Sequence, residues 1–325
     1  QHVSASIGVA LPSEGHDVPD SLLRDADAAM YRAKQRGRAR FEVFDADMRD
    51  TLLRRVETEA ELRHALERGE LHLVFQPAIE IDSGRLVAVE ALARWDHPER
   101  GPVPPAEFIP VAEESGLIVP LGNWVIREAM RRAVEWRKLC RPGERPLVVS
   151  LNLSTRQMSE PGFIASVADA LKETGADPQQ IALEITETVL IEDTDTAAVT
   201  LHALEGLGVR LVLDDFGTGY SSLGYVKRFP LSFLKIDRSF VSTLGESPRD
   251  AAIVSAIVEM SRALGARVVA EGVETEEQLR GVRELGCELA QGYLFARPLP
   301  AAEIDALMRR DPWRTDERTP EPSGA

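Results

Sequence analysis

Acidic side chains recur inside or directly after short apolar segments of this chain. Glu184 lies within the run IALEIT, and Asp214 and Asp215 close the run VRLVLDD. Lys235 in FLKID is a further charge in such a run. A charge in an apolar strand needs a partner, because an unpaired charged group is costly to remove from water. Buried ion pairs explain one or two of these residues but hardly all of them.

Carboxylate or carboxamide residues end, or nearly end, five expected strands: Glu90, Asn152, Glu184, Asp214 with Asp215, and Glu271. In a parallel barrel the C-terminal strand ends converge on one rim, where active sites lie. Carboxylates crowded in a partly dry pocket raise one another's pKa, and a divalent cation relieves that repulsion. Because no cysteine or suitable histidine lies nearby, the oxygen donors favour Mg²⁺ or Mn²⁺, with Ca²⁺ as an alternative, over Zn²⁺ or copper.

The elements that must position these residues alternate between strands and helices. The expected strands are 71–76, 86–95, 147–153, 181–185, 209–213, 233–236, 267–270 and 289–295. The helical runs between them include 105–115, 122–139, 162–174, 196–207, 249–264 and 275–285. This order predicts a (β/α)8 barrel. A doubly wound sheet is the alternative, but no Gly-rich phosphate loop follows the first strand.

Residues 1–45 carry a small pattern of their own. Strand-like runs at 3–10 and 39–44 flank a helical run over 21–37, for which Ser21 is the expected N-cap. One helix and two strands cannot bury a proper core alone. We therefore expect a small N-terminal α+β fragment rather than a complete domain.

Three further segments complete the expected organisation. A charged amphipathic run over 46–69 predicts a connecting helix, residues 70–310 are expected to form the barrel, and the polar tail 311–325 is expected to be disordered.

Cys140 and Cys287 are far apart in unrelated contexts, which indicates a reducing cytoplasm.

The overall charge excludes one class of partner. The 325 residues carry a net charge of −15, which argues against binding a nucleic-acid polymer. A small phosphate compound remains compatible when metal ions supply positive charge. No run approaches the roughly 18 apolar residues of a membrane span, so we expect no membrane contact from this segment.

The motif Glu90-Ala-Leu92 followed by Arg94 resembles the signature of the EAL-domain family of cyclic di-GMP phosphodiesterases. The resemblance covers residues 50–309 and includes FQP at 75–77, SLNLS at 150–154, LEITE at 183–187, DDFGTGYSSL at 214–223, LKID at 234–237, AEGVE at 270–274 and QGYLFARPL at 291–299. It implies a modified (β/α)8 TIM barrel whose first strand runs antiparallel to the others. It also implies hydrolysis of cyclic di-GMP to linear pGpG, which lowers the level of this second messenger.

The resemblance assigns metal and catalytic roles to matching positions. Ligands of a first Mg²⁺ or Mn²⁺ are matched by Glu90, Asn152, Glu184 and Asp214. Asp215 matches a ligand or water-holder for a second metal, and Lys235 matches a residue that positions or activates water. Glu271 matches a proposed general base, although which group is the base stays open. Ca²⁺ is expected to inhibit, because its larger radius and loose geometry hold water and phosphate less suitably.

The remaining matched positions concern substrate and loops. Substrate or water contacts are implied for Gln76, Leu92, Arg94 and Gln291, and support of the metal-site loops for Glu187 and Glu274. An alternative is a catalytically silent module that binds cyclic di-GMP, but such a module normally has a lost ligand or an altered DDFGTG loop, and neither is found. A protein-interaction scaffold is a third class, without positive support in the sequence.

The first residues have a family resemblance of their own. SASIGVA and ADAAMYRAKQRGRARFEVF resemble the C-terminal end of a GGDEF (diguanylate cyclase) domain, but the loop that names that family is absent. The chain is therefore expected not to synthesise cyclic di-GMP and to derive from a longer parent, which an upstream region could anchor to a membrane. EAL-type barrels pair next to the DDFGTG loop, so we expect a homodimer through YSSLGYVKR at 220–228.

Overall fold

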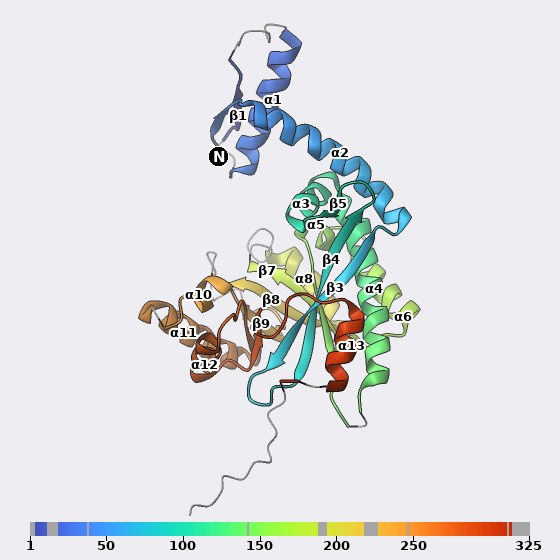
Figure 1. The fold of residues 1–325 in the computed structure, drawn as a ribbon, viewed down its shortest axis with the longest axis vertical. Coiled ribbons are helices and arrows are strands. Elements are labelled where there is room, and N and C mark those ends of the chain that lie inside the picture. Colours follow the sequence, from blue (N-terminus) through green and yellow to red (C-terminus); the bar gives the residue numbers. More distant parts are fainter. Residues whose placement is uncertain are drawn as a thin grey trace, which may run out of the picture.

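The computed structural model describes residues 4–11, 19–37, 39–141, 143–187, 194–217, 227–245, 247–310 and 312–313. Within these ranges eight strands close into a barrel with helices on its outside (Figure 1). The first barrel strand, β3 (Leu71–Glu80), runs antiparallel to both neighbours, β4 (Leu86–His97) and β11 (Leu289–Gln291). The predicted fold class, a (β/α)8 barrel with one antiparallel strand and a small N-terminal α+β fragment, is thus confirmed.

The other barrel strands run parallel to one another. From β4 to β11 the order is β6 (Val148–Asn152), β7 (Ile181–Thr186), β8 (Arg210–Phe216), β9 (Phe233–Ile236) and β10 (Arg267–Ala270). Their carboxyl ends consequently share one rim. The short strand β5 (Gly101–Val103) pairs antiparallel with the end of β4, outside the closed barrel.

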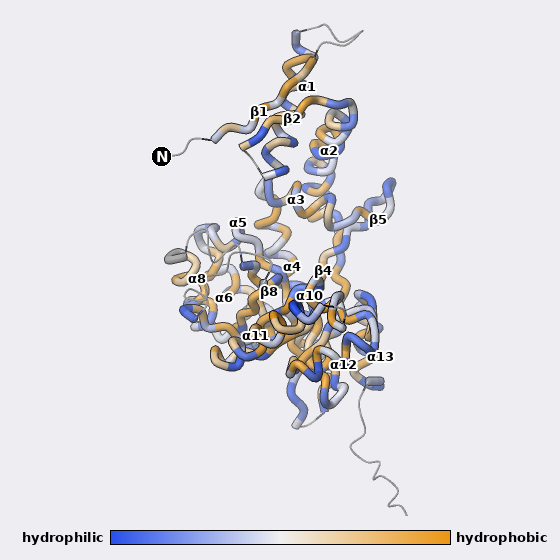
Figure 2. Tube along the Cα trace, turned by 90° about the vertical axis from the view of Figure 1, so that its left-hand side faces the viewer, coloured by the Kyte–Doolittle hydropathy of each residue, from blue (hydrophilic) through white to orange (hydrophobic). Residues whose placement is uncertain are grey.

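Amphipathic helices cover the barrel. They are α3 (Pro105–Ser115), α4 (Ile118–Leu139), α5 (Thr155–Met158), α6 (Phe163–Thr174), η1 (Pro178–Gln180), α8 (Thr194–Gly206), α10 (Arg238–Ser242), α11 (Pro248–Leu264), α12 (Glu276–Glu284) and α13 (Ala301–Arg310). Hydropathy alternates along these outer helices, as expected of helices with one face on the barrel (Figure 2). None of the described helices has the length and apolar composition that crossing a membrane requires.

Inward-facing side chains form layers inside the barrel. A buried apolar layer consists of Val148, Ala182, Val212, Phe233, Val269 and Leu289. Because strand side chains alternate with a period of two, the residues two positions further along point into the same interior. Glu184, Asp214 and Lys235 occupy such positions. The apolar layer therefore closes the floor beneath a polar rim.

The N-terminal part lies apart from the barrel in Figure 1. It contains β1 (Ile7–Val9), α1 (Pro19–Gln35) and β2 (Phe41–Val43), with β1 and β2 paired in parallel. The helix α2 (Ala46–Arg68) then leads to the barrel, with Asp45 as its N-cap. The bounds of the four predicted segments stay predictions, and residues 314–325 of the tail lie outside the described ranges.

Several expected element ends are wrong, among them the start of α1 and the end of β11. Helix α1 begins at Pro19, so Ser21 lies within its first turn and is not the N-cap. The last barrel strand ends at Gln291 rather than four residues later. Gly292 passes so close to the backbone of Val273 that a Cβ would lie 2.1 Å from the Val273 carbonyl oxygen, and the chain turns away there. Sequence alternation does not reveal such a contact between distant segments.

A glycine on α4 allows close approach of the segment that follows β6. An ideal Cβ on Gly122 would lie 1.7 Å from Nε2 of Gln157. Gln157 is buried and forms a capping box with Ser154, the N-cap of α5. This contact holds the turn that directly follows the strand end at Asn152.

Gly122→Ala is expected to lower the free energy of unfolding by about 1–3 kcal/mol, because the new methyl group overlaps the Gln157 amide. The intrinsic helix preference for alanine, about 1 kcal/mol, acts in the opposite direction. Gly206→Ala is the matched control, since nothing lies within 4 Å of its Cβ position. Urea denaturation of both variants measures the difference, and equal stability would contradict the packing argument.

Candidate active site

Lys235 on β9 lies at the centre of the carboxyl-terminal rim. Among the described residues its Nζ meets four carboxylates: Glu271 Oε1 at 2.7 Å, Glu184 Oε2 at 2.8 Å, Glu90 Oε2 at 3.2 Å and Asp214 Oδ1 at 3.3 Å. The Lys235 side chain is only 4% exposed. The structure therefore brings these predicted strand-end residues together around one buried ammonium group.

Two side-chain amides complete the surroundings of Glu90. Asn152 Nδ2 donates to Glu90 Oε1 at 2.8 Å, and Gln291 Nε2 donates to Glu90 Oε2 at 2.7 Å. β6 pairs with β4 on one side, and β11 lies beyond β3 on the other side, so the two amides reach Glu90 from either side of β4. Both oxygens of Glu90 are thus held in place by neighbours that the sequence also singled out.

Crowding and burial shift the pKa values of these groups. Burial raises the pKa of Glu184 to about 8. The neighbouring Glu90 and Asp214 carboxylates also raise this pKa, and the Lys235 ammonium lowers it. Burial likewise raises the pKa of Glu271 to about 7. Burial lowers the pKa of Lys235, but the surrounding carboxylates raise it by more, so that this pKa lies well above the usual value for lysine. The rim holds more negative charge than one ammonium neutralises, which favours cations.

Asp215 joins the site through an exceptional backbone conformation. Its φ of 53° lies in the left-handed region, and the pairing register of β8 shifts between Leu213 and Phe216. Its N–H donates to Asp214 Oδ1 at 2.9 Å. Carboxylate oxygens of Asp214, Asp215 and Glu271 all lie within 4.8 Å of one another. Two consecutive residues therefore face one site, although strand alternation alone would separate them.

This donor set fits a divalent cation. Burial raises the pKa of Asp215, and the adjacent Asp214 carboxylate raises it further. A hard ion such as Mg²⁺ or Mn²⁺ prefers oxygen ligands of this kind. Cys140 and Cys287 are free thiols and are not members of the group that could hold a metal. The carboxylates at the rim outnumber the single positive charge of Lys235, and this excess is the structural reason to expect a metal here.

The predicted loop-support residues lie at two edges of the rim. Glu187 is buried, and its Oε2 accepts from the Gly217 N–H at 3.4 Å. Its Oε1 is buried without a hydrogen-bond partner in the described part of the chain. Glu274 is exposed, and its backbone N–H donates to Gln278 Oε1 at 2.7 Å. Most of the DDFGTGYSSL segment, residues 218–223, lies outside the described ranges.

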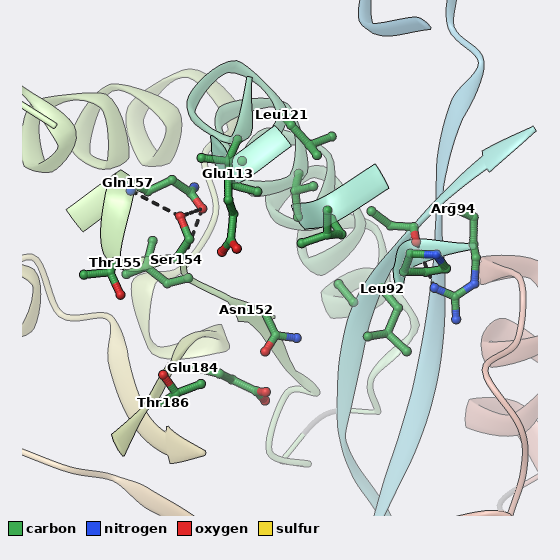
Figure 3. Close-up of a pocket in the computed structure, with 18 residues that line it drawn as sticks. Leu92, Arg94, Glu113, Leu121, Asn152, Ser154, Thr155, Gln157, Glu184 and Thr186 are labelled. Atoms are coloured by element: carbon green, nitrogen blue, oxygen red, sulfur yellow. Dashed lines mark hydrogen bonds between the residues drawn. The ribbon is translucent and has the colours of Figure 1, made fainter. Parts of the chain in front are cut away.

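A cavity of about 380 Å³ opens beside the rim, between β4 and the helices α3 and α4. Leu92, Arg94 and Glu113 line it together with Asn152 and Glu184 from the strand ends. Figure 3 shows the side chains of Asn152 and Glu184 reaching into this space from neighbouring strands. Apolar side chains of α3 and α4 form the remaining wall, so the cavity has one polar and one apolar side.

A second cavity, of about 200 Å³, lies on the other side of Leu92. Its polar lining includes the predicted residues Gln76, Glu90, Glu271, Glu274 and Gln291. Thus the predicted substrate residues divide between adjoining cavities: Arg94 lines the larger, Gln76 and Gln291 line the smaller, and Leu92 belongs to both. The arrangement can accommodate an elongated ligand across the centre of the rim.

Sequence reasoning missed three residues of these cavities. Arg238 and Tyr293 line the smaller cavity, and Glu113 lines the larger one. Arg238 directly follows the LKID motif and Tyr293 lies within QGYLFARPL, so motif proximity was an available signal for both. Glu113 has no such signal, because only the packing of α3 over the barrel brings it there.

Comparison with known proteins places the chain in a family. The model of the EAL domain matches residues 59–298, and that of the diguanylate cyclase GGDEF domain matches residues 1–40. The chain is 44% identical over 303 residues to the bifunctional diguanylate cyclase/cyclic di-GMP phosphodiesterase MucR of Pseudomonas aeruginosa, covering 93% of this chain and 44% of MucR. It is 39% identical over 309 residues to the cyclic di-GMP phosphodiesterase PdeR of Escherichia coli, covering 95% of this chain and 46% of PdeR.

A solved structure supports the same placement. The phosphodiesterase of PaMucR in complex with c-di-GMP is similar to this chain with a TM-score of 0.72 and 44% identity, covering 76% of this chain and 99% of that one. The chain spans about half the length of the curated relatives it matches. The resemblance of the first residues to a GGDEF fragment is confirmed. From the match over residues 59–298 and the shared barrel, the chain belongs to the EAL-domain family.

Proposed function

We propose that this chain is a metal-dependent phosphodiesterase that hydrolyses cyclic di-GMP to linear pGpG. The observation that carries the proposal is the convergence of Glu90, Glu184, Asp214 and Glu271 on Lys235 at the barrel rim. The relatives MucR and PdeR are described as cyclic di-GMP phosphodiesterases, and the PaMucR structure is a c-di-GMP complex. Hydrolysis would lower the level of this second messenger.

Two divalent cations, Mg²⁺ or Mn²⁺, fit the oxygen donors of the rim. Glu90, Asn152, Glu184 and Asp214 would hold the first, and Asp215 would contribute to the second. When bound, such ions supply positive charge that neutralises a phosphodiester and favours ionisation of water. The chain supplies the fixed arrangement of acids, which the barrel strands hold in place before any ligand arrives.

The cavities on either side of Leu92 suit the two halves of a cyclic dinucleotide. Arg94 carries a forked guanidinium suited to phosphate, and the apolar wall of the larger cavity suits a purine. Gln76 and Gln291 line the smaller cavity, where their amides can donate to the other half. The scissile phosphodiester would then lie across the centre of the rim, above Lys235.

The reaction exchanges one phosphorus–oxygen bond for another. The oxygen of water forms a bond to phosphorus as the bond to the 3′-oxygen breaks, and that oxygen takes up a proton from solvent and leaves as a hydroxyl. Lys235 is placed to orient the attacking water through its ammonium protons. Glu271 Oε1, 2.7 Å from Lys235 Nζ, is placed to accept a proton from that water. These assignments give Lys235 and Glu271 roles that differ from that of the proposed metal ligands.

The function is tested by incubating the purified protein with cyclic di-GMP and Mg²⁺ or Mn²⁺ and separating the products by chromatography. Appearance of pGpG is the expected outcome, because the rim carries the full set of donors. Binding of cyclic di-GMP without turnover would overturn the proposal in favour of a silent binding module. Absence of both binding and turnover would leave a protein-interaction scaffold.

Metal removal should abolish turnover. After EDTA treatment we expect no pGpG, and addition of Mg²⁺ or Mn²⁺ should restore it because these ions fit the oxygen donors. Ca²⁺ should bind but support little turnover, since its larger radius and looser coordination geometry would hold water and phosphate less suitably. Chromatography after each addition measures the effect. Full activity after exhaustive EDTA treatment would contradict a metal-dependent reaction.

Lys235→Met tests whether the ammonium of Lys235 offsets the repulsion between the rim carboxylates. Without the ammonium, the buried carboxylates lose their counter-charge, so the free energy of unfolding should fall by about 3–5 kcal/mol. Mg²⁺ should then raise the melting temperature more in this variant than in the wild type. Lys172→Met, at an exposed position on α6, is the control. Equal Mg²⁺-dependent shifts in the three proteins would contradict the role of Lys235.

Glu90→Ala should abolish turnover, because it removes a proposed metal ligand and the acceptor of the Asn152 and Gln291 amides. Lys235→Ala should cut turnover strongly without loss of metal binding. Calorimetric metal titration and chromatography on both variants separate the two effects. A wild-type rate in Glu90→Ala would refute the assignment of Glu90.

We also propose a homodimer through the region after the DDFGTG loop. Residues 218–226 of that region lie outside the described ranges, and the support comes from its mixture of aromatic, apolar and basic residues. Closed homodimers are the commonest oligomers of soluble proteins. Light scattering across a dilution series, with activity recorded on the same samples, should show dimers and lower specific activity on dissociation. A strict monomer with undiminished activity would refute both.

A further inference from the structure

The barrel carries a basic cavity at the end opposite the acidic rim. This cavity of about 400 Å³ lies where the parallel strands begin. Within the described part of the chain, its charged and aromatic lining consists of Glu80, Arg85, Arg145, Arg210, Phe233 and Arg267. Four guanidinium groups against one carboxylate are unusual for a chain whose net charge is −15.

Strand alternation explains why the two ends carry opposite charge. On β8 the side chains of Arg210, Val212 and Asp214 follow one another at intervals of two, so they point into the barrel in sequence. Val212 belongs to the buried apolar layer. The same order of arginine, valine and acid recurs at Arg267 and Val269 on β10 and at Glu271, which directly follows it. The apolar layer therefore separates the basic cavity from the candidate active site.

The guanidinium groups are only partly neutralised within the protein. Arg267 Nη2 donates to Glu80 Oε1 at 3.0 Å, and Glu80 also accepts from the Ser83 hydroxyl at 2.7 Å. Arg210 Nε donates to the Gln179 carbonyl oxygen at 2.8 Å. Arg145 is exposed and makes no side-chain hydrogen bond or ion pair with the residues that the structure describes. The cavity thus keeps donors available for an external anion.

Mutual repulsion supports the same conclusion. Burial lowers the pKa of Arg210, and the positive charges of Arg145 and Arg267 lower it further. The guanidinium of Arg210 also lies 5.7 Å from the centre of the Phe233 ring at the cavity wall, within the range of a cation–π contact. An anion between these groups would relieve the repulsion and use the open donors.

We propose that this cavity binds a small phosphate-bearing anion. Arginine guanidinium groups pair with phosphate through parallel N–H donors, and the volume is in the range of small-molecule sites, roughly 300–1,000 Å³. The wall of Phe233, Val148 and Leu289 offers an apolar surface for an organic group attached to the phosphate. The site is independent of the proposed hydrolysis, because it needs no metal and lies beneath the apolar layer.

A purely structural role would account for only part of this arrangement. Helix carboxyl ends point toward the amino-terminal end of a (β/α)8 barrel, and arginines there complement the helix dipoles. The bond from Arg210 to the Gln179 carbonyl fits that role. It does not explain Arg145, which lies in the loop before β6 and faces the cavity without a protein partner among the described residues.

Calorimetric titration with pyrophosphate in EDTA tests the proposal. EDTA removes divalent metals, so the acidic rim repels the probe and binding reports on the basic cavity. We expect Arg145→Ala to weaken binding at least tenfold, whereas Arg131→Ala, which removes the same charge from α4, should bind as the wild type does. Arg85→Ala should weaken binding in the same way as Arg145→Ala. An unchanged melting temperature without pyrophosphate would exclude misfolding.

Two outcomes would overturn the proposal: no binding of pyrophosphate to the wild type, or equal binding to the Arg145→Ala and Arg131→Ala variants. Titration with GMP and with inorganic phosphate under the same conditions shows whether the cavity recognises a nucleoside phosphate or the phosphate group alone. Tighter binding of GMP than of inorganic phosphate would support a nucleoside phosphate held against Phe233. Equal binding of the two would support recognition of the phosphate group alone.

Discussion

The buried ammonium of Lys235 is the interaction on which the rest of the barrel rim depends. Carboxylates from β4, β7 and β8 and the residue that follows β10 meet at its Nζ, so one side chain on β9 joins separate strands. Removing several charges from water is expensive, and only close pairing with further hydrogen bonds offsets that cost. Asn152 and Gln291 supply such bonds to Glu90. The arrangement remains more acidic than one lysine can neutralise, which is why a cation fits there.

The apolar layer beneath the rim gives the barrel two chemically different ends. Val212 and Val269 lie between acids toward the carboxyl ends of their strands and arginines toward the amino ends. Because a strand side chain repeats its direction every second residue, a five-residue segment suffices to build both ends. Under the proposed function, the acidic end would bind cations and, through them, a phosphodiester. The basic end has hydrogen-bond donors that can bind a phosphate group directly, so anion binding there needs no metal ion.

The connecting helix α2 is joined by ion pairs to the helix that borders the larger rim cavity. Arg55 on α2 pairs with Glu114 on α3 at 2.7 Å, and Arg100 joins Glu61 on α2 at 3.0 Å and contacts Glu107 on α3. The helix α3 then supplies Glu113 and apolar side chains to the cavity wall. Exposed ion pairs contribute little individually, about 0–1 kcal/mol each. Their importance lies in position, because they hold α2 against the helix that borders the larger rim cavity.

The sequence by itself determined the barrel class, the family and the strand-end residues. Short apolar runs that close on Glu90, Glu184 or Asp214 predicted the strand ends, because strand direction decides which end of a parallel barrel a side chain occupies. The motifs around these residues predicted the family. Only the tertiary structure decided that Lys235 contacts these acids at once, that Asp215 turns into the same site through a left-handed residue, and that the chain leaves its last strand at Gly292. It likewise decided that Arg145 and Arg210 share a cavity. These features depend on distances between segments far apart in the chain, and a local pattern carries no information about such distances.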